Sequence, residues 1–417
     1  MLQVKAIKKN INAQFKIVSS KSETNRLLII NKLSNNKIKL NNISNSEDSV
    51  ILSRLLSLIG NKQNNTYNVG MAGTVMRFMT ALLSVTEGEH LITGEKRMCE
   101  RPIGLLVEAL KSIGADIKYI NNEGYPPLLI KGKELYGGHV KIDGSVSSQF
   151  ISALLMIAPT FSNGLTFEFT GNIVSFPYFN LTLKLMEKFG IKYKWKDNNV
   201  LTIENSMYSD SEYTIDADWS SISYWYEIAA LSKESNINIL GINNESLQGD
   251  SIVKDFYENL GVTSTIKDNS LNIKKKLTKL PNRVYFDFID CPDIAQTVIF
   301  TCAGLNIEGV FKGLETLKIK ETDRIIALQN EVKKIGMNFS EKDKTFYLTK
   351  VGSNCLDKNI VFNTYNDHRM AMATAPLSLV YENVIIENHE VVKKSYPYFW
   401  NNLLNAGFAL KKAENEN

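Results

Sequence analysis

Residues 318–336 read Lys-Ile-Lys-Glu-Thr-Asp-Arg-Ile-Ile-Ala-Leu-Gln-Asn-Glu-Val-Lys-Lys-Ile-Gly, and this pattern predicts a helix with a marked start and stop. Its apolar side chains recur at helical spacing, at Ile325, Leu328, Val332 and Ile335. Thr322 is the expected N-cap, and Gly336 is the expected C-terminal stop. We therefore expect a helix with one buried face.

Four charged side chains stand at the entrance of this helix: Lys318, Lys320, Glu321 and Arg324. The backbone N–H groups at a helix N-terminus already favour an anion, so the three cations suit an anionic ligand. Taken alone, the same charges would more simply form a solvated cap. The choice between the two interpretations depends on the rest of the chain.

The order of amphipathic helix and glycine recurs six times along the chain, mostly with a short alternating strand behind it. The glycines that end the helices are Gly60, Gly114, Gly190, Gly261, Gly336 and Gly407. After a shorter first interval they lie 71 to 76 residues apart. That spacing is too long for a solenoid of units of about 20 to 50 residues, and it suits six small α/β subdomains. Chance similarity of amphipathic helices would explain two or three copies more readily than six in order.

The composition is that of a globular protein with enough residues for two ordinary domains. The 417 residues are 44% hydrophobic and 22% charged. Lys plus Arg exceeds Asp plus Glu by only four. The charge therefore gives no reason to expect nucleic acid, although local cationic clusters suit small anions.

Cysteine usage and hydropathy indicate a cytoplasmic protein. The cysteines are widely spaced and form no metal-ligand pattern, so we interpret them as reduced structural thiols: Cys99, Cys291, Cys302 and Cys355. Residues 1–20 lack a continuous apolar core, and no apolar run approaches the roughly 18 residues of a membrane span. We expect neither an export signal nor a membrane-spanning segment.

Several turns place small polar or cationic residues directly before an apolar helix. They are residues 19–26, 69–77, 144–150, 175–178, 290–293 and 365–369. Such turns offer backbone amides and side-chain donors to an anion, although each is also compatible with a solvated turn or ordinary capping. The first of these turns, residues 19–26, lacks the glycines of a GxxxxGK[ST] loop, so it is not expected to bind a nucleotide. Asp293 is either a cap or a catalytic carboxylate, and His368 is interpreted as a hydrogen-bonded structural residue.

These motifs together resemble those of the 5-enolpyruvylshikimate-3-phosphate synthases along almost the whole chain. Eight motifs carry the resemblance: Ser20-Lys-Ser22 with Asn25-Arg26, Ala72-Gly-Thr74 with Met76-Arg77, Arg101-Pro-Ile103, Gly124-Tyr-Pro-Pro-Leu128, Gly144-Ser-Val-Ser-Ser-Gln149, Pro292-Asp293, Lys320-Glu-Thr-Asp-Arg324 and Tyr365-Asn-Asp-His-Arg-Met-Ala-Met372. Each motif is short, but eight in the same order are specific.

The resemblance implies an α/β fold of two similar globular domains, each of three βαβαββ subunits, in an inside-out, barrel-like arrangement. This fits the six copies of helix and glycine. The chain would cross between the domains twice, so that residues 1–19 and 214–417 form the first domain and residues 20–213 form the second. The active site would lie in the interdomain cleft, with helix N-termini from both domains facing it.

The reaction that the resemblance implies is transfer of the enolpyruvyl group of phosphoenolpyruvate to the 5-hydroxyl of shikimate 3-phosphate, with release of phosphate. This step belongs to the shikimate pathway to chorismate and aromatic amino acids. It needs a base for the hydroxyl, an acid for the methylene carbon and cations for the anionic groups. The resemblance assigns these proton transfers to Lys21, Asp293 and Glu321. It implies no metal or organic cofactor, no nucleic-acid or membrane partner, and a monomer.

The resemblance also assigns residues to the two substrates. The residues for shikimate 3-phosphate are Lys21, Ser22, Arg26, Ser147, Ser148, Gln149, Ser175, Asp293 and Lys320. The residues for phosphoenolpyruvate are Lys21, Gly73, Arg101, Gln149, Arg324, Arg369 and Lys394.

Five positions depart from the family's commoner pattern. Met71, Phe78, Phe176, Thr316 and Lys318 stand where members commonly have asparagine, proline, a basic residue, asparagine and arginine, respectively. The charged groups assigned above are all present, so these departures concern the fine detail of the two binding sites.

Two other functions were weighed. The related enolpyruvyl transferase that acts on UDP-N-acetylglucosamine shares the architecture, but it uses a cysteine on a mobile loop and lacks the Lys-Ser-x-x-Asn-Arg and Ser-Ser-Gln patterns present here. The more remote alternative is a non-catalytic α/β repeat protein that binds anions or nucleic acid. Phosphate release from phosphoenolpyruvate on addition of shikimate 3-phosphate separates these functions.

Overall fold

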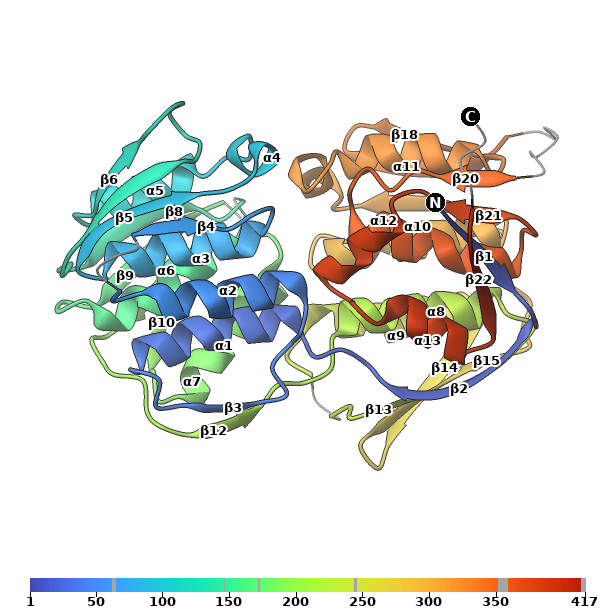
Figure 1. The fold of residues 1–417 in the computed structure, drawn as a ribbon, viewed down its shortest axis with the longest axis horizontal. Helices are drawn as coiled ribbons and strands as arrows, with labels where there is room; N and C mark the ends of the chain where they lie inside the picture. The colour runs from blue at the N-terminus through green and yellow to red at the C-terminus, as the bar shows by residue number, and fades with distance from the viewer. Residues whose placement is uncertain (62–64, 146, 172, 244–245, 352–358, 414–417) are drawn as a thin grey trace. The chain divides into compact units, whose positions relative to one another are not determined.

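The computed structural model describes residues 1–417 except 62–64, 146, 172, 244–245, 352–358 and 414–417, and the chain forms two compact units (Figure 1). Unit 1 comprises residues 1–18 and 216–417, and unit 2 comprises residues 19–215. The sequence analysis placed the crossings after residues 19 and 213. The second crossing comes later because the Ile215 N–H donates to the Asn41 carbonyl of unit 2.

Unit 1 contains three four-stranded sheets that share one plan. Two parallel strands lie side by side, and an antiparallel pair completes the sheet. In spatial order the strands are β2 (Asn10–Lys16), β13 (Glu234–Leu240), β15 (Ser270–Lys275) and β14 (Val262–Lys267); β16 (Arg283–Asp287), β17 (Glu308–Lys312), β19 (Thr345–Lys350) and β18 (Met337–Lys342); and β20 (Ile360–Phe362), β21 (Val384–Ile386), β1 (Leu2–Ala6) and β22 (Phe408–Lys412). Strands β2 and β13 pair in one sheet, although all of unit 2 lies between them in the sequence. Unit 1 is therefore discontinuous.

Unit 2 contains two sheets of the same plan and a third with only two strands. In spatial order the strands are β4 (Thr66–Asn68), β5 (Gly88–Thr93), β7 (Leu128–Gly132) and β6 (Asp116–Tyr119); β8 (Gly138–Asp143), β9 (Leu165–Thr170), β11 (Val200–Ile203) and β10 (Tyr193–Asp197); and the parallel pair β12 (Glu212–Thr214) and β3 (Lys39–Asn41). Within the described residues, five copies of the expected βαβαββ subunit are therefore complete, and the sixth lacks its antiparallel pair.

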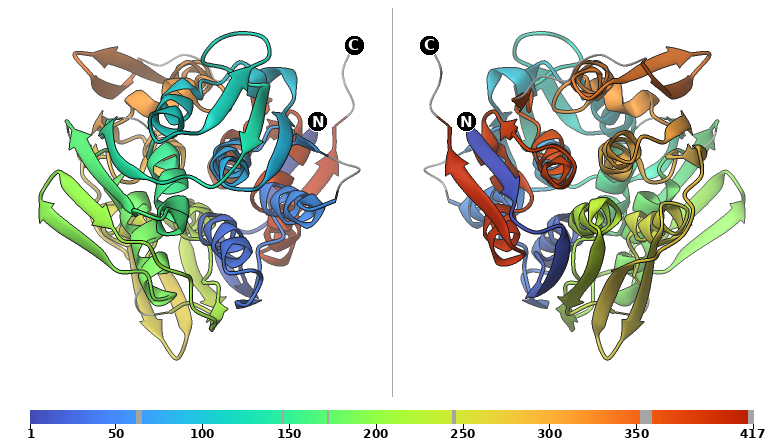
Figure 2. Two further views of the ribbon diagram at one scale, coloured as in Figure 1. Left: turned by 90° about the vertical axis from the view of Figure 1, so that its left-hand side faces the viewer. Right: turned by 90° about the vertical axis from the view of Figure 1, so that its right-hand side faces the viewer.

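Each unit is centred on three helices that are buried along most of their length and contact one another. They are α8 (Trp219–Leu231), α10 (Ala295–Gly304) and α12 (His368–Thr374) in unit 1, and α1 (Lys21–Leu33), α3 (Gly73–Ser84) and α6 (Ser148–Ile157) in unit 2. Helix α3 illustrates the cause, because its side chains are apolar on nearly every face and such a helix belongs in a core. In the left-hand view of Figure 2, helices of unit 2 are seen nearly end-on, with strands around them.

The six helices that the sequence predicted to stop at glycine are the second helices of the six copies. They are α2 (Glu47–Leu58), α5 (Gly104–Ser112), α7 (Phe176–Lys188), α9 (Val253–Glu258), α11 (Arg324–Lys333) and α13 (Phe399–Asn405). The φ angles of the six glycines lie between 76° and 99°. This left-handed conformation ends a helix and favours glycine, so the predicted stops are confirmed. The described residues also contain the short helix α4 (Lys96–Cys99) and six 3₁₀ segments: 158–160, 249–252, 292–294, 315–319, 375–379 and 389–394.

The predicted N-cap of α11 was wrong by one residue. Asp323, not Thr322, caps the helix, because its Oδ1 accepts the backbone N–H groups of Ile325 at 3.0 Å and Ile326 at 3.1 Å. A carboxylate satisfies two helix N–H groups at once and also favours the positive end of the helix dipole. Arg324 is therefore the first residue of the helix, directly after its cap.

The described cysteines are free thiols, of which Cys291 and Cys302 are buried and Cys99 is half-buried, while Cys355 lies outside the described residues. None of the helices in the described part of the chain combines the length and the apolar character that a membrane crossing needs.

Candidate active site

Asp293 lies at the centre of a cationic cluster in unit 1. The 3₁₀ turn Pro292–Ile294 places it just before α10. One carboxylate oxygen, Oδ2, contacts the NH2 group of Arg369 at 2.8 Å. The other, Oδ1, lies 3.5 Å from NH1 of Arg324 and 3.6 Å from Nζ of Lys320. Three cations from two segments of the chain, residues 320–324 and Arg369, thus surround one carboxylate.

Glu321 links one further cation, Lys394, to this cluster through Arg324. Its Oε2 accepts from NH2 of Arg324 at 2.9 Å, and its Oε1 accepts from Nζ of Lys394 at 3.2 Å. Arg324, only 1% exposed, also donates from Nε to Oδ2 of Asp367 at 2.7 Å. All six residues that the sequence assigned to the site from this unit lie together: Asp293, Lys320, Glu321, Arg324, Arg369 and Lys394. With Asp367, four cations face three carboxylates, an excess of positive charge that suits an anionic ligand.

The cations change the acidity of the central carboxyl. Burial opposes ionisation of Asp293, but the charges of Arg369, Lys320 and Arg324 outweigh it and hold the pKa of Asp293 well below its usual range. Burial lowers the pKa of Lys320, and the Asp293 charge offsets part of that shift. An anion that neutralised some of these cations would raise the pKa of Asp293 toward the range of an effective base.

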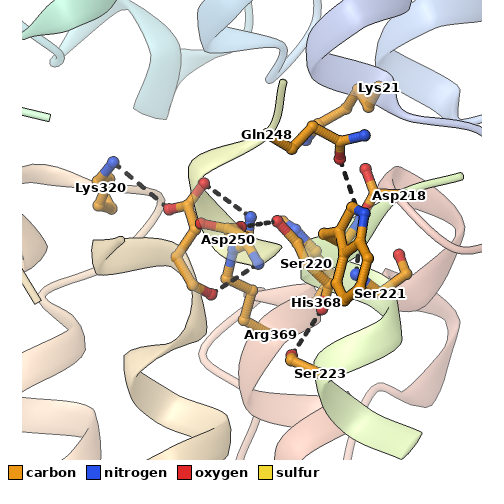
Figure 3. Close-up of polar contacts among 12 residues, drawn as sticks. Lys21, Asp218, Ser220, Ser221, Ser223, Gln248, Asp250, Lys320, His368 and Arg369 are labelled. Carbon is orange, nitrogen blue, oxygen red and sulfur yellow. Dashed lines mark hydrogen bonds and ion pairs between the residues drawn. The ribbon is translucent and has the colours of Figure 1, made fainter. Parts of the chain in front are cut away.

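Two residues that the sequence analysis did not select lie near this cluster. Asp250, in the 3₁₀ segment Gly249–Ile252, accepts a hydrogen bond from the Ser220 hydroxyl (Figure 3). Burial and the charge of Asp293 raise the pKa of Asp250 to about 6, although Arg369 opposes the shift. Asp250 belongs to none of the motifs singled out in the sequence, and its contact with Ser220 joins residues 30 positions apart, so spacing alone could not have found it.

A second cationic site lies in unit 2, where Arg101 packs against the first residue of α3. A Cβ atom added to Gly73 would lie 2.6 Å from NH1 of Arg101. The Nε and NH1 groups of Arg101 are buried and have no hydrogen-bond partner among the described residues. Arg77 holds the two segments together by donating to the carbonyls of Gly73 and Pro102, each at 3.0 Å. A helix N-terminus beside a guanidinium with unused donors is an arrangement that binds anions.

Lys21 opens α1 and pairs with a residue that the sequence analysis missed. Its Nζ lies 3.2 Å from Oδ2 of Asp48, the second residue of α2. The Ser20 side chain caps α1 by accepting the Glu23 N–H at 3.3 Å. The contact between α1 and α2 creates the Lys21–Asp48 pair, and the sequence carried no signal for it.

Arg26 is buried between helices, where its donors already have protein partners. It donates to Thr182 Oγ1 at 2.7 Å, to the Ser22 carbonyl at 2.9 Å and to Ser152 Oγ at 3.1 Å. Burial lowers the pKa of Arg26 to about 10, against the raising influence of Tyr178 and Glu23. A phosphate could bind this guanidinium only through the remaining N–H of NH1 or by displacing one of these partners.

The polar residues expected for the second substrate stand at two other helix starts of unit 2. Ser147 caps α6 by accepting the Gln149 N–H at 3.4 Å, and Ser148 is the first residue of that helix. Ser175 precedes α7 in a left-handed conformation with φ 52°. Val146 of the same motif lies outside the described residues.

Three of the departures from the family's pattern can be placed. The Lys318 ammonium forms an ion pair with Glu341 at 2.7 Å, away from Asp293. The hydroxyl of Thr316 is buried without a partner in the described residues. Phe176, 44% exposed, packs on Phe179 and offers no charge at the start of α7.

No group of three or more His, Cys, Asp or Glu side chains in the described parts of the chain is arranged to hold a metal ion. The fold and the two cationic sites define the class as an α/β enzyme that acts on anionic small molecules.

Comparison with known proteins gives the family. The family model described as EPSP synthase (3-phosphoshikimate 1-carboxyvinyltransferase) matches residues 5–403, and the chain belongs to this family. A 3-phosphoshikimate 1-carboxyvinyltransferase of Bacteroides fragilis (strain YCH46) is 45% identical over 405 residues, which cover 97% of each chain. One of Haemophilus influenzae (strain PittGG) is 35% identical over 425 residues, with 95% of this chain and 96% of that protein covered. These matches confirm the resemblance seen in the sequence, and the chain is a transferase of this type.

A solved structure supports the fold independently. The EPSP synthase of Acinetobacter baumannii superimposes with a TM-score of 0.75 over 99% of this chain and 100% of that one, at 18% identity. The two-unit α/β architecture expected from the sequence is thereby confirmed.

Proposed function

We propose that the chain transfers the enolpyruvyl group of phosphoenolpyruvate to the 5-hydroxyl of shikimate 3-phosphate. The hydroxyl oxygen forms a bond to C2 of phosphoenolpyruvate, the hydroxyl proton passes to a base, and a second proton adds to C3. Loss of phosphate and of a C3 proton then restores the double bond. The observation that carries this proposal is the cluster in which Asp293 and Glu321 lie among four cations.

The proposal gives each charged residue of unit 1 a role. Asp293 is the base at the 5-hydroxyl, and Lys320 holds shikimate 3-phosphate beside it. The carboxylate and phosphate of phosphoenolpyruvate bind Arg324, Arg369 and Lys394. Glu321 contacts two of these three cations, which supports a role in proton transfer at the donor.

Unit 2 supplies the remaining contacts in this proposal. Lys21 takes part in proton transfer, and Arg101 with the N-terminus of α3 at Gly73 binds the donor. The residues for shikimate 3-phosphate are Ser22, Arg26, Ser147, Ser148, Gln149 and Ser175, and Gln149 also contacts the donor. Residues of both units would act on one pair of substrates in a cleft between the units.

The test is release of phosphate from phosphoenolpyruvate by the purified chain. Release is expected with shikimate 3-phosphate. Release only with UDP-N-acetylglucosamine, or no release with either acceptor, would contradict the proposal. Asp293→Asn and Glu321→Gln should each lower kcat by about 100-fold or more, because each removes a proton-transfer group. Glu308→Gln, which changes a carboxylate paired with Arg283 on β16, is the matched control and should leave kcat unchanged. We further propose that the enzyme is a cytoplasmic monomer, which sedimentation analysis and cell fractionation would test.

A further inference from the structure

Glu331 is a fully buried carboxylate that binds the loop in front of α12. Its side chain is 0% exposed. Oε1 accepts the Tyr365 hydroxyl at 2.8 Å, and Oε2 accepts the Asn363 backbone N–H at 3.0 Å and Lys334 Nζ at 2.7 Å. Hydrogen bonds to a buried carboxylate are stronger than those between neutral groups, so this residue holds the loop firmly.

Arg324 and Glu331 fasten the same loop at two points along one face of α11. The two residues are seven positions apart, which is about two helical turns and roughly 10 Å of rise. At the first point Arg324 bonds to Asp367, and at the second Glu331 bonds to Tyr365 and to Asn363. The position of the loop on the helix therefore depends on both attachments.

The loop needs this support because two consecutive residues adopt an unfavourable backbone conformation. Tyr365 has φ 53° and Asn366 has φ 56°. The left-handed region is unfavourable for residues other than glycine, and asparagine tolerates it better than tyrosine. The Asn366 side chain accepts a hydrogen bond from Asn388 at 2.5 Å, and Tyr365 is held by Glu331.

Asp367 follows this strained pair and serves both anion-binding arginines. Its carboxylate is 0% exposed, accepts from Arg324 Nε at 2.7 Å and accepts the backbone N–H of Arg369 at 2.8 Å. Relaxation of the loop would displace Asp367, the hydrogen-bond acceptor of the Arg324 side chain and of the Arg369 backbone. The Arg324 guanidinium would lose its acceptor, and the start of α12 that carries Arg369 would shift. Both guanidinium groups would then have to be realigned when an anion binds, and this realignment would weaken binding.

We propose that Glu331 is a positioning residue for phosphoenolpyruvate, which acts through Tyr365 and Asp367 on the alignment of Arg324 and Arg369. The inference rests on the proposed function in one respect, namely that these two arginines hold the anionic groups of the donor. Glu331 does not itself touch the reacting atoms, because α11 and the loop surround it.

The test compares Tyr365→Phe and Glu331→Gln with the parent. Tyr365→Phe removes only a hydroxyl and should raise the KM for phosphoenolpyruvate about tenfold, while kcat and the KM for shikimate 3-phosphate stay within about twofold. Glu331→Gln replaces one acceptor oxygen with a donor and should raise the same KM further. Tyr226→Phe is the matched control, because it removes a buried tyrosine hydroxyl that bonds to Ser264 on β14.

The controls separate positioning from simple destabilisation. A purely structural role predicts a lower Tm for Tyr365→Phe and Tyr226→Phe alike and an unchanged KM, which would overturn the inference. Equal increases in the KM of both substrates would overturn it as well. Calorimetric titration with phosphoenolpyruvate measures binding without turnover. A parent that binds the donor but releases no phosphate refutes the proposed function. The role of Glu331 is then still tested, by comparing the affinity of the parent for the donor with that of Glu331→Gln and Tyr365→Phe. A parent that does not bind the donor refutes both.

Discussion

Gly73 begins α3 with the guanidinium of Arg101 directly beside its Cα. A methyl group there would approach NH1 of Arg101 to 2.6 Å, closer than side-chain atoms pack, so the guanidinium must shift. Members of the family that this chain resembles are inhibited by glyphosate, an occupant of the donor site. We predict that Gly73→Ala raises the inhibition constant of glyphosate at least about tenfold, which is roughly 1.4 kcal/mol. The smaller donor should be affected less, so activity should survive.

The comparison is made against the parent, with the KM for shikimate 3-phosphate as the internal control. Equal inhibition constants for parent and variant would show that the start of α3 does not line the donor site.

Glu227 offers a residue-scale test of the unit 1 core. It lies on α8, one of the three central helices of unit 1, and is 0% exposed. Its two carboxyl oxygens have no hydrogen-bond partner among the described residues. Burial raises the pKa of Glu227 well above 4.5, so the folded state holds a proton that the unfolded chain loses. The stability that this proton contributes is present below the unfolded pKa and is lost as pH rises toward the folded pKa.

We therefore predict that the thermal midpoint of the parent falls as pH rises above about 4.5, and that Glu227→Gln reduces this fall. The neutral amide resembles the protonated carboxyl in size. The measurement is Tm at successive pH values, with Glu308→Gln as the control at a half-buried carboxylate that is paired with Arg283. Parallel curves for parent and Glu227→Gln would mean that Glu227 does not titrate in this range.

At the scale of the element, the cap of α11 links helix stability to the site. Asp323→Ala leaves two helix N–H groups without their acceptor, at a cost of about 1 kcal/mol of stability. Because Arg324 follows the cap directly, the KM for phosphoenolpyruvate should also rise. Thr322→Ala is the matched control one residue earlier. The measurement is Tm together with KM, and equal effects of the two substitutions would contradict the assignment of the cap.

The sequence predicted helices better than it predicted contacts between them. The glycine stops of α2, α5, α7, α9, α11 and α13 were visible because positive φ demands a particular residue at a fixed place. The Lys21–Asp48 pair and the position of Asp250 were not visible, because they arise from the packing of segments that are far apart in sequence. The sequence also predicted Thr322 as the N-cap where Asp323 caps the helix, because both residue types cap helices and spacing did not separate them.

At the scale of the whole molecule, the repeat accounts for the division of the site residues between the units. Five copies have four strands, and the sixth retains only β12 and β3 in the described residues. In unit 2, Lys21, Gly73 and Ser148 are the first residues of the central helices α1, α3 and α6. In unit 1, Asp293 and Arg369 lie at the starts of α10 and α12. The roles of these residues stay predictions, because they came from the resemblance to a family and not from spacing.

The last prediction concerns movement of the two units on binding. In the proposed function, anionic groups of one substrate pair bind cations of both units, and we therefore expect ligands to favour a state with the units drawn together. Ligands shift such an equilibrium only by their differential affinity for the two states. We predict that shikimate 3-phosphate with glyphosate lowers the radius of gyration in small-angle scattering. Shikimate, which lacks the phosphate, is the matched control and should have a smaller effect at equal concentration. An unchanged radius at concentrations where calorimetry shows saturation would contradict a clamp of two units around the substrates.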